Sequence, residues 1–208
     1  MTARELMLRR IRDAKAVLPN GDAVAREYRR HGSTDRRTLI DLFSSRLADY
    51  GATVYRTAAP ALPDELANAL GGAACAVPSG LARAWTPPGA MVDYPPLDVA
   101  TLDRVAVVVT ESAAACAETG TIALDGSIGQ GRRALTLVPD WHICVVHTED
   151  IVHTVPELLA RLVPTRPLTL ISGPSATSDI ELRRVQGVHG PRTLTVVLVG
   201  PELGIKDH

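Results

Sequence analysis

Short runs of consecutive non-polar residues alternate along the chain with segments whose non-polar residues recur every three or four positions. The run at 105–109 contains only Val and Ala, which is typical of a strand covered on both faces. Comparable runs predict further strands at 52–56, 73–77, 121–124, 134–138, 142–146, 168–171 and 192–199. Helical spacing or helix-favouring small residues predict helices at 2–17, 35–50, 63–70, 110–117 and 156–162, the last with Thr154 as its cap.

This alternation predicts an α/β fold, a three-layer α/β/α sandwich around a mixed, mostly parallel sheet. Part of the sheet is expected to be antiparallel, because the strands between 121 and 146 follow one another without a helix. Residues 1–34 are expected to form an N-terminal helix and linker, and residues 35–208 the α/β domain. The proline-rich segment 82–98 is expected to be irregular, either as a lid or as a covering loop.

Composition excludes several classes of protein. The net charge of −1 argues against a nucleic-acid partner, although residues 1–50 carry a local excess of basic side chains. The N-terminal segment lacks a signal-peptide pattern, and no run is long enough to span a membrane, so a cytoplasmic protein is expected. Three isolated cysteines, none in a CxxC pair, and the lack of a dinucleotide fingerprint predict no metal site and no intrinsic cofactor.

A polar turn after the predicted strand 168–171 is the first candidate site. Hydroxyl groups crowd it, and the pattern Ser178-x-x-Glu181 is typical of a capping box that opens a helix. A helix N-terminus after a strand suits a small anion, whereas helix capping alone would also explain each single residue. The candidate ligand-binding residues of this turn are Gly173, Ser175, Thr177, Ser178, Asp179 and Glu181.

Two further turns carry candidate catalytic groups. Glu118 stands among small residues, where burial would either demand hydrogen-bond partners or raise its pKa for acid–base or nucleophilic work. Thr119 and Gly120 follow it as candidate ligand-binding residues. His189, in a turn with Gly187, is either a general base or ligand donor, or a hydrogen-bonded turn residue.

Four segments of the sequence resemble the LUD domain family in the family's order, and the chain is similar to its lactate-utilisation protein C type. They are Ala-Glu-Thr-Gly-Thr at 117–121, Leu-Val-Pro-x-x-His-Ile-x-Val-Val at 137–146, Gly-Pro-Ser-x-Thr-x-Asp-Ile-Glu at 173–181 and Gly-Val-His-Gly-Pro at 187–191. The resemblance implies a fold like that of the NagB/RpiA/CoA-transferase superfamily. It also implies work beside iron–sulfur partner proteins that oxidise L-lactate to pyruvate.

Two functions therefore remain open. In one, the protein is a cluster-free accessory component that binds a small anionic metabolite, iron–sulfur partner proteins, or both. In the other, it is a small-molecule enzyme that uses Glu118 as CoA-transferases use a glutamate, an argument by analogy of fold. Either function predicts that Glu118, Ser175, Thr177, Asp179 and His189 converge on one pocket. The oligomeric state is left open.

Overall fold

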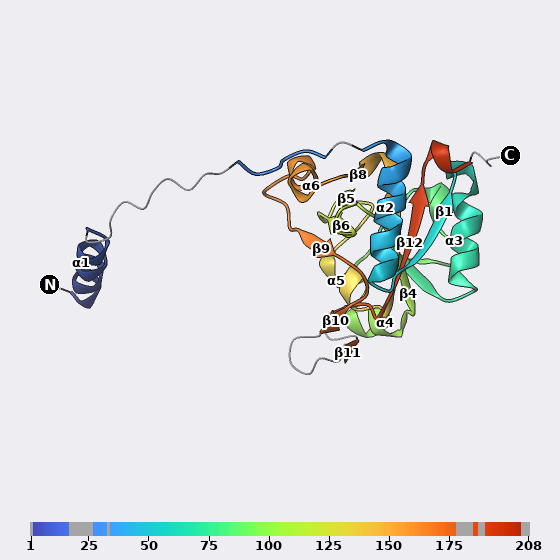
Figure 1. Cartoon of the computed structure of the whole chain (residues 1–208). Helices are drawn as coiled ribbons and strands as arrows, with labels where there is room; N and C mark the ends of the chain where they lie inside the picture. Colours follow the sequence, from blue (N-terminus) through green and yellow to red (C-terminus); the bar gives the residue numbers. More distant parts are fainter. Residues whose placement is uncertain (1, 17–26, 33, 178–184, 187–189, 205–208) are drawn as a thin grey trace.

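The computed structural model describes residues 2–16, 27–32, 34–177, 185–186 and 190–204. Its centre is a six-stranded sheet in which every neighbouring pair of strands is parallel (Figure 1). In spatial order the strands are β1 (Thr53–Thr57), β12 (Thr193–Val199), β7 (Trp141–His147), β4 (Val107–Glu111), β2 (Cys75–Val77) and β3 (Met91–Val92). The predicted α/β architecture with a mostly parallel sheet is confirmed.

Non-polar side chains project from both faces of this sheet, as the continuous non-polar runs predicted. On one face, alternate residues of the strands pack with α3 (Leu62–Leu70) and with Trp85 of the 3-10 helix η2 (Arg83–Trp85). The other face is covered by α2 (Arg36–Asp49), α4 (Val99–Arg104) and α5 (Arg133–Leu137). Helices therefore lie on both sides of the sheet, which gives the predicted three layers.

The antiparallel strands form a second sheet instead of part of the first. Its order is β8 (Ile151–Val152), β5 (Ala114–Cys116), β6 (Thr121–Leu124) and β9 (Thr169–Ile171), and β6 is antiparallel to both of its neighbours. One face of this small sheet packs on α2 and the large sheet, and the other packs on α6 (Val155–Arg161). The capping box of α6, built by Thr154 and Glu157, confirms the predicted cap.

Two predicted elements are wrong. The segment 110–117 is not a helix, because it ends β4 and then forms β5, where Ala114, Ala115 and Cys116 are buried between two layers. Only small side chains fit there, so tertiary packing overrides the helix propensity of alanine. The segment 134–138 is not a strand but largely helix α5, since short apolar runs do not separate the two states.

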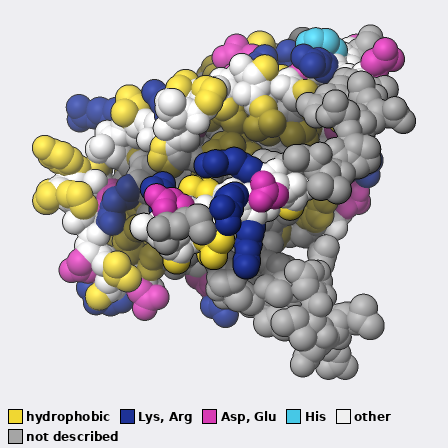
Figure 2. Space-filling model, turned by 90° about the vertical axis from the view of Figure 1, so that its left-hand side faces the viewer, with side chains coloured by type: hydrophobic (Ala, Val, Ile, Leu, Met, Phe, Trp, Pro, Cys, Tyr) yellow, Lys and Arg dark blue, Asp and Glu magenta, His cyan; other side chains and the backbone are white. Residues whose placement is uncertain are grey.

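The N-terminal helix α1 spans Ala3–Ala16, as predicted, and leaves Met7, Leu8 and Ile11 substantially exposed. It lies on the side of the molecule that faces the reader in Figure 2, where basic side chains gather beside non-polar ones. None of the described helices combines the length and apolar composition that crossing a bilayer requires.

The remaining elements are short. They are η1 (Ala59–Ala61), η3 (Thr148–Asp150) and η4 (Pro201–Gly204), and the two-stranded antiparallel pair of β10 (Ala176–Thr177) and β11 (Val185–Gln186). The helix predicted to open at Ser178 lies outside the described residues, but the residues that flank it pair as strands.

Candidate functional site

The predicted polar turn lines a cavity of about 280 Å³. The turn follows β9 directly, as the sequence predicted, and its lining residues Gly173 and Ser175 face Gly190 and Pro191 of the segment before β12. The rest of the wall comes from β9, from α5 and from the first residues of two strands of the large sheet, through Thr169, Leu170, Thr136, Leu137, His142 and Leu194. Three segments far apart in sequence therefore enclose one space.

This cavity lies at the amino edge of the large sheet. His142 is the second residue of β7 and Leu194 the second residue of β12, and the two are paired in register. The strand whose carboxyl end feeds the turn, β9, belongs to the small sheet. The predicted strand followed by a polar turn is confirmed, whereas the position of this turn relative to the large sheet depends on the tertiary fold.

Among the described residues that line this cavity, His142 is the ionisable one, and the sequence did not single it out as a site residue. Its side chain is buried, and its Nε2 lies 2.8 Å from Thr110 Oγ1. The Thr110 hydroxyl donates to the Glu111 carbonyl at 3.0 Å, so Nε2 carries the proton that Thr110 accepts. Burial lowers the pKa of His142 to about 4, which keeps the ring neutral near pH 7. Its position inside the 137–146 segment was the one sequence signal for it.

A second hollow adjoins this cavity and shares Thr136 and Thr169 with it. Two consecutive arginines line the hollow. Arg132 is committed to Asp93, to which it donates two hydrogen bonds at 2.8 and 3.0 Å. Arg133 is exposed and forms no ion pair with any residue that the structure describes. An anion held in the shared space would therefore meet a guanidinium with free donors.

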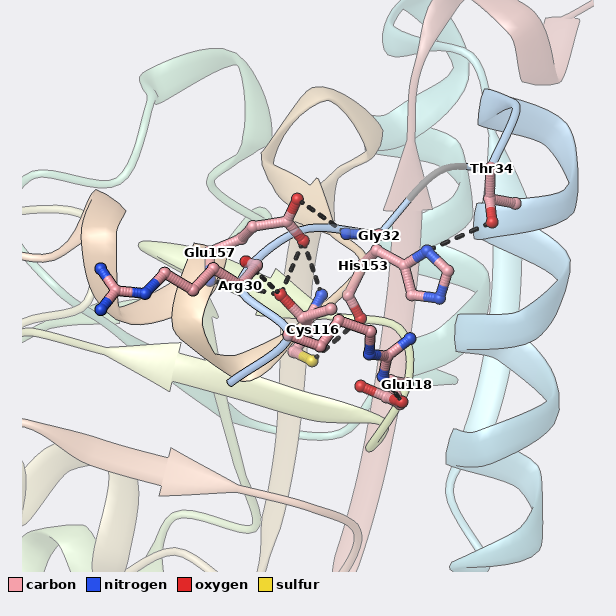
Figure 3. A network of polar contacts seen from close by, with 9 residues as sticks. Arg30, Gly32, Thr34, Cys116, Glu118, His153 and Glu157 are labelled. Carbon is pink, nitrogen blue, oxygen red and sulfur yellow. Dashed lines mark hydrogen bonds and ion pairs between the residues drawn. The ribbon is translucent and has the colours of Figure 1, made fainter. Parts of the chain in front are cut away.

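Glu118 does not line the cavity that Ser175 lines. Its carboxylate is partly exposed and pairs with the guanidinium of Arg29 (Figure 3). Thr119 lies closer to the turn, because its hydroxyl is 2.7 Å from that of Thr121, which is 2.8 Å from that of Ser172. Hydrogen bonds between hydroxyl groups thus connect the segment after Glu118 to Ser172, the residue before Gly173. The Glu118 carboxylate itself points to Arg29 instead.

The arm at 27–34, predicted as part of a linker, is held against the small sheet and α6 where it is described (Figure 3). Thr154 Oγ1 donates to the carbonyl of Arg30 at 3.1 Å, and the backbone N–H of Gly32 donates to Glu157 at 3.4 Å. A Cβ on Gly32 would lie 2.1 Å from the His153 ring, so the backbone crosses directly over that imidazole. Thr34 completes the contact, 3.2 Å from His153 Nδ1.

Two glycines predicted to bind ligand are packed against the last turns of α2. Gly120 has φ +60°, and a Cβ there would lie 2.8 Å from Arg46 Cβ and 3.3 Å from the Leu47 nitrogen. Gly173 has φ +88°, and a Cβ would lie 2.5 Å from Tyr50 Cβ. The lack of a side chain at both positions is explained by left-handed backbone and by close approach to the helix.

Replacing Gly120 by alanine is expected to lower the free energy of unfolding by about 2 kcal/mol, since both the left-handed backbone and the contact with α2 oppose a Cβ. Gly71→Ala is the matched control. Gly71 has φ +55° but nothing within 4 Å of its Cβ position, so only the backbone cost of about 1 kcal/mol is expected. Chemical denaturation of both variants measures the difference. Equal losses would contradict a close-packing role for Gly120.

Several predicted site residues fall where the structure gives no description. Ser178, Asp179, Glu181, Gly187 and His189 lie outside the described residues, and Thr177 is placed only as backbone in β10. The predicted convergence of five residues is therefore untested as a whole. Among the described residues, Gly173 and Ser175 share the cavity wall, and Glu118 is not part of it.

Comparisons with known proteins agree with the architecture. The LUD domain family model matches residues 100–199. Over 172 residues the chain is 50% identical to a Deinococcus radiodurans protein called Lactate utilization protein C, which covers 79% of this chain and 81% of that protein. It is 34% identical over 106 residues to the Lactate utilization protein C of Macrococcus caseolyticus, which covers 47% of this chain and 45% of that protein.

The crystal structure of a DUF162 family protein from Deinococcus radiodurans is also similar, with a TM-score of 0.71 and 41% identity. The similarity covers 81% of the present chain and 100% of the Deinococcus chain.

Proposed function

Because the chain belongs to the lactate utilization protein C family of LUD-domain proteins, we propose that it serves lactate utilisation as an accessory component. In this role it binds a small anionic metabolite and works beside iron–sulfur partner proteins that carry the electrons. The similarity to the Deinococcus protein over most of both chains is the observation that carries the proposal.

The cavity and the adjoining hollow support the metabolite part of this proposal. A volume of about 280 Å³ suits a molecule of a few heavy atoms. Neutral His142 and the hydroxyl of Thr136 offer hydrogen-bonding groups in the wall of the cavity, while Arg133 provides positive charge in the adjoining hollow that shares Thr136 with it. A 2-hydroxy or 2-oxo acid would place its carboxylate toward Arg133, because a guanidinium pairs with a carboxylate through two parallel hydrogen bonds.

The cysteines support the assignment of electron transfer to partners. Oxidation of lactate releases two electrons, which side chains alone carry poorly. Cys75, Cys116 and Cys144 are all buried, and burial raises the pKa of Cys144 to about 12. A buried thiol at neutral pH is a poor ligand, because metals bind the thiolate.

The binding role predicts that Arg133→Gln weakens binding of L-lactate or pyruvate about tenfold, since it removes one charge-assisted pair worth about 1.5 kcal/mol. Wild-type affinity is expected in the millimolar range for so few atoms. NMR titration of purified protein measures both affinities. Arg104→Gln, which removes an exposed arginine of α4, should leave binding unchanged, and equal affinity in the Arg133 variant would contradict the site.

The accessory role is tested in the native host and with the isolated protein. Purification through a tag should bring iron–sulfur proteins with the chain, and deletion of its gene should abolish growth on L-lactate. The isolated protein should not oxidise L-lactate with an artificial electron acceptor until those partners are added. Turnover by the isolated chain, or normal growth after deletion, would overturn the proposal.

A further inference from the structure

The cavity proposed to hold a metabolite offers more room than lactate can fill. Its volume of about 280 Å³ corresponds to about nine water molecules, at about 30 Å³ each in the liquid. Half of the non-hydrogen atoms of lactate form the carboxylate, which pairs with Arg133 of the adjoining hollow in the proposed function. A methyl, a hydroxyl and one carbon then remain for the cavity. Such a small group leaves much of the wall without contact, and each lost contact forfeits dispersion energy.

Several polar groups of the wall can accept hydrogen bonds but have their donor hydrogens engaged within the protein. The Thr136 hydroxyl donates to a backbone carbonyl of α5 at 3.2 Å, and the Nε2–H of His142 is directed at Thr110 Oγ1 at 2.8 Å. The backbone N–H of Ser175 donates to the carbonyl of Pro191 at 2.9 Å, and a proline has no N–H of its own. These groups suit a ligand hydroxyl, which donates, and disfavour a carboxylate, which only accepts.

Non-polar side chains form much of the remaining wall. Ile171 and Leu194 belong to the core that α2 covers, and Leu194 is buried whereas Ile171 keeps exposed surface. Leu137, the last residue of α5, is also half-buried. A Cβ on Gly190 would lie 3.6 Å from Leu137 Cδ2, so the end of this side chain reaches the segment that lines the cavity. Partly exposed non-polar side chains around a concave space favour a ligand with a non-polar body.

The positive charge lies beside this non-polar space, not within it. Arg133 lines the hollow, which has a volume of about 370 Å³ and shares Thr136 and Thr169 with the cavity. Among the described residues of the cavity wall itself, none is Lys or Arg, and the ionisable His142 is neutral near pH 7. A ligand that uses both spaces must therefore carry its charge at one end and its non-polar part at the other.

We infer that the ligand of this site is a 2-hydroxy acid whose side chain is branched, non-polar and larger than the methyl group of lactate. Its carboxylate pairs with Arg133, its hydroxyl donates to Thr136 Oγ1, and its side chain lies against Leu137 and Ile171. Arg133 and Thr136 are three residues apart on α5, and such positions are neighbours on a helix surface, as the carboxylate and the hydroxyl are on the ligand. The inference rests on the proposed metabolite role and narrows the class of metabolite.

The test is an NMR titration of the purified protein with two charged probes and one neutral probe. L-2-Hydroxyisocaproate carries an isobutyl group in place of the methyl group of L-lactate, and its amide lacks the charge. Backbone amide signals of Gly173 and Gly190 report the cavity. L-2-Hydroxyisocaproate should bind at least tenfold more tightly than L-lactate, since each fully buried methylene adds about fourfold in affinity. The amide should bind about tenfold more weakly than the acid.

The outcomes distinguish the inference from the proposed function. L-Lactate binding as tightly as L-2-hydroxyisocaproate, or more tightly, would overturn the inference and leave the proposed function standing. Equal binding of the acid and its amide would overturn the assignment of the charged end to Arg133. If neither acid binds, both the inference and the proposed metabolite role are wrong.

Two variants and a control separate the two ends of the ligand. Leu137→Ala should weaken L-2-hydroxyisocaproate binding about fivefold and L-lactate binding less than twofold, so the ratio of the two affinities falls. Arg133→Gln should weaken both acids by a similar factor and keep the ratio. Leu159→Ala is the control, because this exposed leucine of α6 lines a different hollow, and both affinities should be unchanged. An unchanged ratio in Leu137→Ala, or the same change in Leu159→Ala, would overturn the inference.

Discussion

Lowering the pH from about 6.5 to about 4 is expected to remove about 3 kcal/mol from the free energy of unfolding through His142 alone. Burial lowers the pKa of this histidine to about 4 in the folded protein, while the unfolded chain has the ordinary value of 6.5. Between these values the unfolded state binds the proton and the folded state does not. Stability from this residue is therefore fully present above pH 6.5 and falls as the pH decreases toward 4.

The variant that isolates this effect is His142→Gln. A glutamine Nε2–H can replace the imidazole Nε2–H that lies 2.8 Å from Thr110 Oγ1, but the amide does not titrate. Urea denaturation of both proteins at pH 7, 5.5 and 4 gives two stability curves. Carboxylates titrate in both, so the difference between the curves reports His142. Parallel curves would contradict a neutral, buried histidine at this position.

Arg132→Gln is expected to lower the free energy of unfolding by about 3 kcal/mol. Asp93 is 9% exposed and receives two hydrogen bonds from Arg132 and one from the Leu97 N–H at 2.8 Å. Arg132 also donates to the Leu97 carbonyl. Removing the guanidinium leaves a buried carboxylate without its charge partner, and it releases the irregular segment that Asp93 and Leu97 anchor.

Arg133→Gln is the control for that loss. This neighbouring arginine is exposed and pairs with no described carboxylate, so its removal should change stability by less than about 0.5 kcal/mol. Chemical denaturation at pH 7 measures both variants. Arg132 should thus contribute to stability, and Arg133 to anion binding. A comparable loss of stability in both variants would contradict this difference.

The Asp93 pair also predicts a dependence on pH. Hydrogen bonds from Arg132 lower the pKa of Asp93 below its usual range, despite the opposing effect of burial. Its contribution to stability is therefore present above the usual aspartate pKa and is lost as the pH falls through the lowered value. In Arg132→Gln this acid-side loss should shrink, because the pair is already absent. The same denaturation series at acid pH checks it.

The sequence motifs identified the turns near the candidate site, but they did not predict the role of each residue in those turns. Gly120 and Gly173 belong to quoted motifs, and their positions follow from contact with α2, which no local pattern contains. Glu118 was expected in a pocket with Ser175, whereas the structure pairs it with Arg29 across 89 residues of sequence. Such long-range partners depend on how the arm and the sheets are arranged, and the sequence of either segment carries no sign of the other.

Hydrophobic patterning by itself determined the fold class, because a strand covered on both faces must be continuously non-polar and α2 must show one apolar face. It did not determine the state of 110–117 or 134–138, where the same small or apolar residues suit a helix and a strand equally well. Only the tertiary structure decided whether each segment is a helix or a strand. In β5, for example, the small side chains fit as a strand in the narrow space between two layers. It likewise placed the predicted turn at the amino edge of the large sheet, because strand order arises from packing between distant segments.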